Sequence, residues 1–192
     1  QMKHRLTQKG YACAPDTDLQ LAIETACPFT LTPDQTTALA DIKQDMESNT
    51  PMDRILCGDV GFGKTELMIR ATLKALENNK QDVILAPTTI LAQQHLTLFQ
   101  ERLKNTPYII QGLSRFQQPN QQKNIAQALK QGRCDAIIGT HRLLSKDIQF
   151  YNLGLLIIDE EQRFGVKHKE KIRTLSKEVI DTLYVSATPI PR

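Results

Sequence analysis

The feature that most constrains this chain is a glycine-rich run between two predicted elements. Residues 58–65 read G-D-V-G-F-G-K-T, a full match to the pattern G-x-x-x-x-G-K-[ST]. A short apolar stretch at 53–57 precedes the run, and an amphipathic helix is predicted over 64–78. Glycines at a strand-to-helix turn let backbone N–H groups surround phosphate oxygens, and the helix N-terminus adds partial positive charge. The run therefore predicts an α/β domain that binds a nucleotide through its phosphates.

Two polar residues of the run have predicted contacts of their own. We expect Lys64 to reach the β- and γ-phosphates and the Thr65 hydroxyl to bind Mg²⁺. The alternative, a chance glycine turn, is disfavoured by the flanking elements. The predicted nucleotide-binding residues of the run and the helix it opens are Gly58, Asp59, Val60, Gly61, Phe62, Gly63, Lys64, Thr65 and Glu66. One phosphate cradle serves kinases, GTPases, transporters and motors, so a second motif must decide the chemistry.

The rest of the chain alternates between short apolar strands and amphipathic helices. The predicted strands are 53–57, 82–86, 107–111, 135–139, 153–158 and 181–186, and the predicted helices between them are 64–78, 88–103 and 120–131. Residues 153–158 are apolar at consecutive positions, which is typical of a central strand covered on both faces. This rhythm predicts an α/β fold of the P-loop NTPase type, a three-layer sandwich with a mostly parallel central sheet.

The first part of the chain reads differently. Residues 1–28 are mixed polar, with apolar residues at helical spacing, and are predicted to form an N-terminal helical linker before a domain over 29–192. At the start of that domain, Thr32 is the expected N-cap of a helix that runs to about residue 46. Gln35, three residues later, is the expected partner in a capping box.

Composition excludes several classes of protein. The 192 residues are 40% hydrophobic and 23% charged, close to ordinary globular usage. The four cysteines form no C-x-x-C pair, so neither a zinc ribbon nor a redox dithiol is indicated, and a cytoplasmic location is expected. No apolar run approaches the roughly 18 residues of a membrane span, so no membrane partner is expected. The four histidines lack metal spacing, and the net charge of +3 permits nucleic-acid binding without arguing for it.

The second motif follows the predicted central strand. Asp159-Glu160-Glu161-Gln162 stands where an open parallel sheet places its ligands. Asp159 is suited to hold Mg²⁺ through water, and Glu160 is suited to polarise an attacking water as general base. The alternative is that these acidic residues only cap a following helix. Together with the phosphate-binding run, the motif indicates hydrolysis of a nucleoside triphosphate rather than transfer of phosphate to a metabolite.

These motifs, with Ser186-Ala187-Thr188 after a later strand, resemble superfamily-two helicases and translocases, whose ATP-binding lobe is RecA-like. Within that group the chain is most similar to the bacterial transcription-repair coupling factors, the Mfd family. The resemblance covers about 29–192, and 1–28 is similar to the linker before that motor. The runs that carry it are M-D-R-I-L-C-G-D-V-G at 52–61, P-T-T-I-L-A-Q-Q-H at 87–95, I-G-T-H-R-L-L at 138–144, D-E-E-Q-R-F-G-V at 159–166 and S-A-T-P-I-P-R at 186–192. RecG-type branch-migrating helicases share R-F-G and T-P-I-P-R and are the second choice.

The resemblance implies roles for residues of the nucleotide site, with ATP and Mg²⁺ as cofactors. The implied catalytic residues are Lys64, Asp159, Glu160 and Gln162, and the implied metal ligands are Thr65 and Asp159. Gln35 is similar to the glutamine that reads adenine, and Phe29 is a candidate to stack on the base. The capping box is the alternative for Gln35, and both roles are compatible because an amide has several donors and acceptors.

The resemblance also implies a grip on the backbone of double-stranded DNA. Hydroxyls, backbone amides and arginines on loops after strands suit phosphate contacts, which set register without reading bases. The residues concerned are Thr88, Thr89, Ser114, Arg115, Thr140, His141 and Arg142. For Thr88 the alternative is a helix N-cap. Ser186 and Thr188 are implied to link nucleotide state to DNA grip, or else form an ordinary strand-end turn. The basic run at 167–173 is read as a solvated helix face or as a further DNA contact.

Motors of this class close a second lobe over the nucleotide, and that lobe supplies arginine fingers. The given sequence stops at Arg192, so we expect this chain alone to bind ATP and DNA but to hydrolyse ATP weakly. In a whole protein the resemblance implies ATP-driven movement on double-stranded DNA that displaces stalled RNA polymerase and then recruits excision-repair proteins. A non-catalytic module that binds DNA or a neighbouring domain is the alternative, and a P-loop kinase is disfavoured because no lid-like arginine cluster is present.

Overall fold

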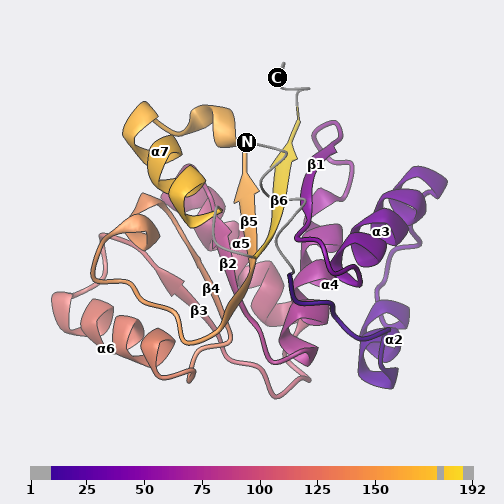
Figure 1. Cartoon of the computed structure of the whole chain (residues 1–192), viewed down its shortest axis with the longest axis horizontal. Helices are drawn as coiled ribbons and strands as arrows, with labels where there is room; N and C mark the ends of the chain where they lie inside the picture. Colours follow the sequence, from indigo (N-terminus) through magenta and orange to yellow (C-terminus); the bar gives the residue numbers. More distant parts are fainter. Residues whose placement is uncertain (1–9, 177–179, 188–192) are drawn as a thin grey trace.

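A single sheet organises the computed structural model, which describes residues 10–176 and 180–187 (Figure 1). Its six strands lie in the order β1-β6-β5-β2-β4-β3, and every neighbouring pair is parallel. The strands are β1 (Asp53–Cys57), β2 (Gln81–Leu85), β3 (Ile110–Leu113), β4 (Ala136–Gly139), β5 (Leu153–Asp159) and β6 (Asp181–Ser186). Parallel neighbours need long crossover connections, which the intervening helices provide. The predicted α/β fold is confirmed.

Helices cover both faces of the sheet. They are α2 (Asp18–Thr25), α3 (Pro33–Met46), α4 (Lys64–Glu77), α5 (Thr89–Arg102), α6 (Pro119–Lys130) and α7 (Val166–Leu175), with short 3₁₀ turns η1 (His141–Leu144) and η2 (Glu161–Arg163). Buried residues of α3, α4 and α5 share one hydrophobic cluster with the sheet, and those of α6, α7 and η1 share another. Figure 1 shows α6 and α7 over one face, so the predicted three layers are present.

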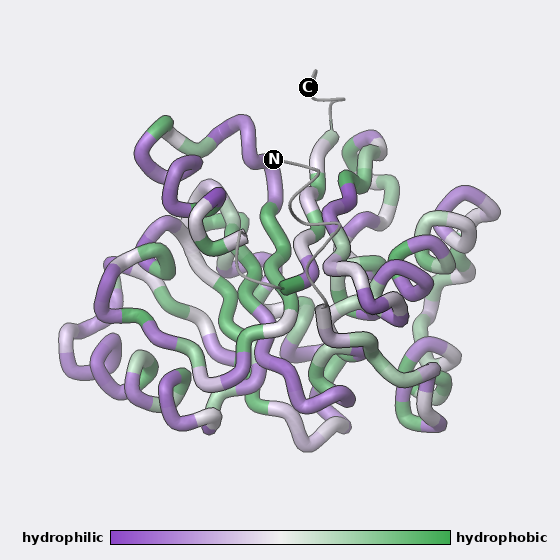
Figure 2. The backbone as a smooth tube through the Cα atoms, viewed as in Figure 1, coloured by the Kyte–Doolittle hydropathy of each residue, from purple (hydrophilic) through white to green (hydrophobic). Residues whose placement is uncertain are grey.

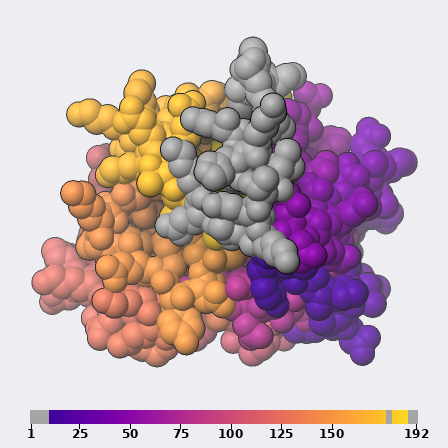
Figure 3. All heavy atoms as spheres, viewed as in Figure 1, coloured from indigo at the N-terminus to yellow at the C-terminus, as the bar shows by residue number. Residues whose placement is uncertain are grey.

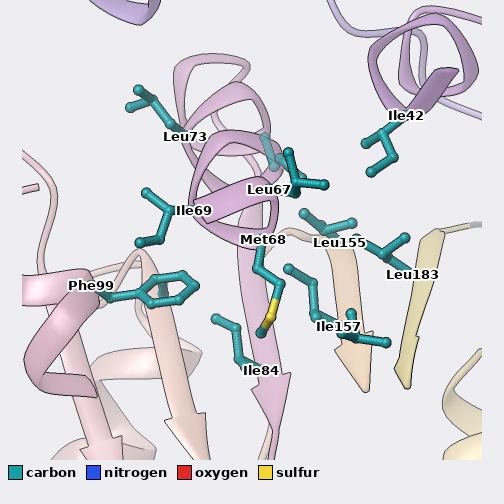
Figure 4. Close-up of a cluster of buried hydrophobic side chains, with 14 of the residues drawn as sticks. Ile42, Leu67, Met68, Ile69, Leu73, Ile84, Phe99, Leu155, Ile157 and Leu183 are labelled. Carbon is teal, nitrogen blue, oxygen red and sulfur yellow. The ribbon is translucent and has the colours of Figure 1, made fainter. Parts of the chain in front are cut away.

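Strand β5 explains how one strand serves both clusters. Leu155 and Ile157 belong to the cluster under α4, while Leu156 and Ile158 belong to the opposite one. All four side chains are fully buried, because successive residues of a strand point to opposite faces. Figure 4 shows the α4 side of this packing, and Figure 2 shows the hydrophobic residues gathered on the central strands. The strand that ends in Asp159 is therefore held firmly on both sides.

The described part of the N-terminal segment packs on the domain. Lys74 of α4, whose side chain is only 2% exposed, pairs with Asp16 at 2.8 Å and with Glu47 at 2.6 Å. Burial lowers the pKa of Lys74, but the hydrogen bonds that its ammonium donates to both carboxylates more than offset this and leave the pKa above its ordinary value. The segment 10–28 therefore contacts α4 through an ion pair. A separate linker that ends at residue 28 stays a prediction.

One predicted strand was misplaced. The structure has β3 at Ile110–Leu113 instead of 107–111. Pro107 has no N–H to donate to a ladder, and the Ile109 N–H donates to the Asp135 carboxylate at 2.7 Å, so pairing starts one residue later. Gly112 lies within this strand, and a Cβ there would come 2.5 Å from Leu96 of α5, so the glycine lets α5 pack closely on the strand. Among the described residues, no helix is long and apolar enough to cross a membrane.

Candidate nucleotide and nucleic-acid sites

A cavity of about 550 Å³ lies at the carboxyl ends of β1, β5 and β6, which are neighbours in the sheet. The glycine-rich run, the start of α4 and the D-E-E-Q motif contribute to its walls, with Phe29 and residues of α5. This is the edge at which open parallel sheets bind ligands, and the volume is in the range of small-molecule and cofactor sites. The two motifs that are about 100 residues apart in the sequence therefore line one pocket.

The loop between β1 and α4 depends on two glycines. Gly61 and Gly63 have φ angles of 85° and 74°, in the left-handed region that favours glycine. Gly63 is also the residue before α4, and a Cβ there would meet the Gln35 amide at 2.8 Å. The alternative of an unrelated glycine turn does not explain why both glycines line one cavity with Asp159 and Glu160. The loop geometry fits a phosphate cradle.

Lys64 lies across its own loop. Its ammonium group donates to the Gly58 carbonyl at 2.5 Å and to the Asp59 carbonyl at 2.8 Å. These acceptors are neutral, whereas a phosphate oxygen is negatively charged, so a phosphate would add Coulomb attraction to the hydrogen bond from the ammonium. A phosphate group in the cradle can therefore compete with both carbonyls for the ammonium.

Gln35 joins the first helix of the domain to the phosphate loop. Its side-chain oxygen accepts from the Thr32 N–H at 2.8 Å, while Thr32 accepts from the Gln35 N–H, so the capping box is confirmed. The other end of the amide donates to the Phe62 carbonyl. Phe29 is 75% exposed and lines the same cavity. Contact of Gln35 or Phe29 with adenine stays a prediction, and the structure adds a role for Gln35 in holding the loop.

Asp159 is held by a residue of α5. Its carboxylate oxygen Oδ2 lies 2.8 Å from Nε2 of His95, and both residues are more than 90% buried. A carboxylate accepts hydrogen bonds, so Nε2 is the donor. The pair joins residues 64 positions apart in the sequence. Asp159 and Thr65 line one cavity, which fits the oxygen ligands that Mg²⁺ prefers.

Glu160 connects the hydrolysis motif to the end of β6. Its φ of 49° is left-handed, a conformation that costs a non-glycine residue about 1–3 kcal/mol and tends to occur at functional sites. Backbone pairing with Val185 at 2.8 Å and a bond from the Ala187 N–H to the carboxylate at 3.0 Å hold it there. Gln162 donates to the same carboxylate and lies 3.5 Å from the Ser186 hydroxyl. The two motifs form one network, and Thr188 lies outside the described residues.

Glu66 lines the cavity but is engaged by arginines. Arg70 and Arg102 each approach its carboxylate at 2.9 Å. Burial raises the pKa of Glu66, but hydrogen bonds from Arg102 and Arg70 outweigh burial and leave the pKa below its ordinary value. A carboxylate beside a phosphate site would repel phosphate, and the two guanidinium groups offset that repulsion. Whether Glu66 contacts nucleotide stays a prediction.

The residues predicted to contact DNA follow β2, β3 and β4, which are adjacent in the other half of the sheet. Thr88 caps α5, with its hydroxyl accepting from the Leu91 N–H at 3.2 Å, so the alternative role of Thr88 is confirmed. Arg115 is exposed, with its guanidinium 5.0 Å from the Phe116 ring centre. Because neighbouring strands end side by side, three sequence-distant loops form one surface.

The loop after β4 is the most structured of the three. Arg142 forms a two-pronged pair with Asp147 at 2.9 and 2.6 Å, so a phosphate would compete with that carboxylate. His141 stacks on His168 of α7 with ring centres 4.6 Å apart. Burial, and then the electrostatic effect of His168, Arg115 and Lys171, lower the pKa of His141. Thr140 is only 2% exposed, and its hydroxyl has no partner among residues 10–176 and 180–187.

The remaining predicted contacts in these loops are less distinctive. Thr89, the first residue of α5, and Ser114, just after β3, are partly exposed, and the Ser114 N–H donates to the Gln117 side chain at 2.9 Å. The basic run at 167–173 is helical, with most of its charges facing solvent. Figure 3 shows the C-terminal part of the chain, which includes α7, in yellow at the surface, and α7 contacts η1. DNA contact by any of these residues stays a prediction.

Comparison with known proteins identifies the family. The model of the DEAD/DEAH box helicase family matches residues 32–192, most of the chain. The chain belongs to this family. It is 53% identical over 190 residues to the transcription-repair-coupling factors of Staphylococcus aureus strains USA300 and NCTC 8325, and equally identical to that of Staphylococcus epidermidis strain ATCC 35984. Each alignment covers 99% of this chain and 16% of the relative, so the chain spans about a sixth of their length. The predicted resemblance is confirmed.

A solved structure supports the same fold. The structure of RecG bound to a three-way DNA junction superposes with a TM-score of 0.85 and 37% identity, covering 100% of this chain and 25% of that one. The RecA-like arrangement predicted from the motifs is thereby confirmed. Identity to the coupling factors is higher than identity to RecG, in agreement with the sequence motifs that favoured the former.

Sequence reasoning assigned no role to three titratable residues of the cavity in this helicase-family domain. His95, Arg102 and Arg163 line the pocket, yet none was assigned a role. His95 and Arg163 stand inside runs that mark the family, which was the available signal, whereas Arg102 ends α5 with no motif around it. Their roles depend on where α5 and η2 lie against the loop after β5, and that position is a tertiary property.

Proposed function

We propose that this chain is the ATP-binding first lobe of a motor that moves along double-stranded DNA. The observation that carries the proposal is that the phosphate loop and the D-E-E-Q motif line one cavity, in a chain 53% identical to transcription-repair-coupling factors. A non-catalytic binding module has no need for an acidic network at a phosphate cradle. ATP with Mg²⁺ is the ligand that this donor set fits best.

Each polar residue of the cavity has a step in this proposal. Lys64 leaves the Gly58 and Asp59 carbonyls and binds the β- and γ-phosphates. Thr65 and Asp159 would hold Mg²⁺, which would neutralise phosphate charge. Glu160, fixed by the Ala187 N–H, accepts a proton from the attacking water, and Gln162 orients the Glu160 carboxylate.

The loops after β2, β4 and β3 provide the DNA surface. Phosphate contacts by Arg115, Arg142 and the hydroxyls around them would hold the duplex backbone without reading sequence, as a motor on any sequence requires. Ser186, which lies 3.5 Å from Gln162, stands between the hydrolysis motif and β6 and is suited to link nucleotide state to DNA grip. We propose the same role for Thr188 on the basis of the sequence motif alone.

In the whole protein, we propose that the nucleotide site and the DNA surface serve to displace stalled RNA polymerase and to couple transcription to nucleotide excision repair. We propose the bacterial cytoplasm as the location. The relatives that are 53% identical to this chain are named transcription-repair-coupling factors, whereas RecG is 37% identical. These values support this assignment over branch migration by a RecG-like helicase. Contacts with RNA polymerase and with repair proteins are assigned to other parts of the relatives, of which this chain covers 16%.

The test compares this chain with a longer protein that continues through a second lobe. We expect both to bind a fluorescent ATP analogue with Mg²⁺, the chain to hydrolyse ATP slowly, and the longer protein to be stimulated by duplex DNA. Lys64→Ala should abolish turnover in the longer protein. Rates that are equal in the two proteins and independent of DNA would contradict the motor, and DNA binding with no turnover in either would favour a binding module.

A further inference from the structure

Helix α5 touches both halves of the nucleotide cavity. Its buried residues are Ala92, His95 and Phe99, spaced three and four apart, so they form the stripe that packs on the sheet (Figure 4 shows Phe99). At the end of the helix, Arg102 pairs with Glu66, the residue after Thr65. The helix is therefore fixed against the cavity at two positions, and His95 is the one that reaches Asp159.

His95 is an unusual residue for its position. On a stripe shared with Ala92 and Phe99, an apolar side chain would pack without cost, whereas burial of an imidazole N–H is costly unless it is hydrogen-bonded. The ring is 8% exposed and its Nε2 meets the Asp159 carboxylate at 2.8 Å. Within the described ranges, it is the side chain that hydrogen-bonds this carboxylate. The contact explains why a polar residue stands here.

We propose that His95 is a positioning residue for Asp159, fixing the rotation of its carboxylate so that one oxygen is bound by the imidazole and the other is left for Mg²⁺ or its bound water. The inference rests on the proposed function. A buried carboxylate on a rigid strand has only its side-chain torsions left to vary, and a planar ring on a packed helix removes that freedom. Partners of this kind orient ligands, and their loss typically weakens metal affinity 10–100-fold.

The test measures metal-dependent binding of nucleotide, not turnover. A fluorescent non-hydrolysable ATP analogue is titrated into this chain with EDTA and with increasing Mg²⁺, and Mn²⁺ bound with the nucleotide is followed by electron paramagnetic resonance. The gain from Mg²⁺ is the affinity with Mg²⁺ divided by the affinity of the same protein in EDTA, and His95→Leu should reduce this ratio about tenfold. His95→Gln, which keeps an N–H on the same face, should recover part of the gain. His95→Met is the apolar substitute if the leucine variant does not fold.

A matched control comes from the same helix. Gln100 donates to the Ile110 carbonyl at 3.0 Å and does not line the nucleotide cavity, so Gln100→Leu removes one structural bond of α5 elsewhere. It should keep the full gain from Mg²⁺. A gain that is unchanged in folded His95→Leu, or reduced equally in Gln100→Leu, would overturn the inference alone. A wild-type chain that binds no nucleotide, or binds it without help from Mg²⁺, would overturn the proposed function as well.

Discussion

Asp82 gives the sharpest test of how this fold is held together. The residue lies in β2 under α4 and is fully buried, and its carboxylate accepts a hydrogen bond from the Thr72 hydroxyl of α4. Burial raises the pKa of Asp82 from 3.8 to about 7, and the bonds from Thr72 and the Val83 backbone offset only part of that rise. No cation stands beside it among the ion pairs of the described residues. Below about pH 7 the folded state therefore keeps Asp82 protonated.

The sign of the pH effect follows from that preference. Between 3.8 and about 7 the unfolded chain has released the Asp82 proton and the folded chain has kept it, so unfolding is favoured as pH rises through this window. A difference of one pKa unit corresponds to about 1.4 kcal/mol. Ionisation of Asp82 therefore lowers the free energy of unfolding by about 4 kcal/mol at most, a limit reached above pH 7. About 3 kcal/mol of it falls between pH 5 and pH 8. Against a total stability of about 5–15 kcal/mol, this is a large share.

Asp82→Asn removes the ionisation and keeps the shape. Urea unfolding of the wild type and the variant at pH 5 and pH 8 isolates the contribution, because the other titrating groups are common to both. We expect the wild type to lose about 3 kcal/mol more than the variant over this interval. Thr72→Val removes the hydrogen bond that lowers the Asp82 pKa. This variant should therefore lose more stability than the wild type between pH 5 and pH 8. Equal losses in the wild type and Asp82→Asn would refute the reasoning.

Further predictions concern the site and its supports. Glu160→Gln should keep affinity for the ATP analogue while lowering hydrolysis by about 10²-fold or more in the longer protein, measured by phosphate release; equal rates would contradict its role as base. Lys74→Ala should destabilise the fold by about 1–2 kcal/mol in urea, since it removes the ion pair with Glu47 and one of the two ion pairs of Asp16, which keeps Lys43. Gly63→Ala should weaken analogue binding more than Gly61→Ala, because only at Gly63 would the added Cβ also meet Gln35.

Several features were decided locally and were therefore readable from the chain. The capping box at Thr32 and Gln35 involves residues three apart, and the strand-loop-helix order around Lys64 needs only its flanking residues. Consecutive apolar residues at 153–158 predicted a strand buried on both faces, because a strand exposes alternate residues to opposite sides. The parallel sheet followed from the alternation of strands and helices.

Other features depended on where distant segments meet. The strand order β1-β6-β5-β2-β4-β3 brings the nucleotide motifs to one half of the sheet edge and the candidate DNA loops to the other. The His95–Asp159 bond joins two elements 64 residues apart, and the start of β3 was set by Asp135 on the neighbouring loop. Periodicity and propensity describe a residue's own element, whereas these contacts arise from packing between elements. The sequence by itself determined which chemistry the chain carries, and the tertiary structure decided which side chains hold that chemistry in place.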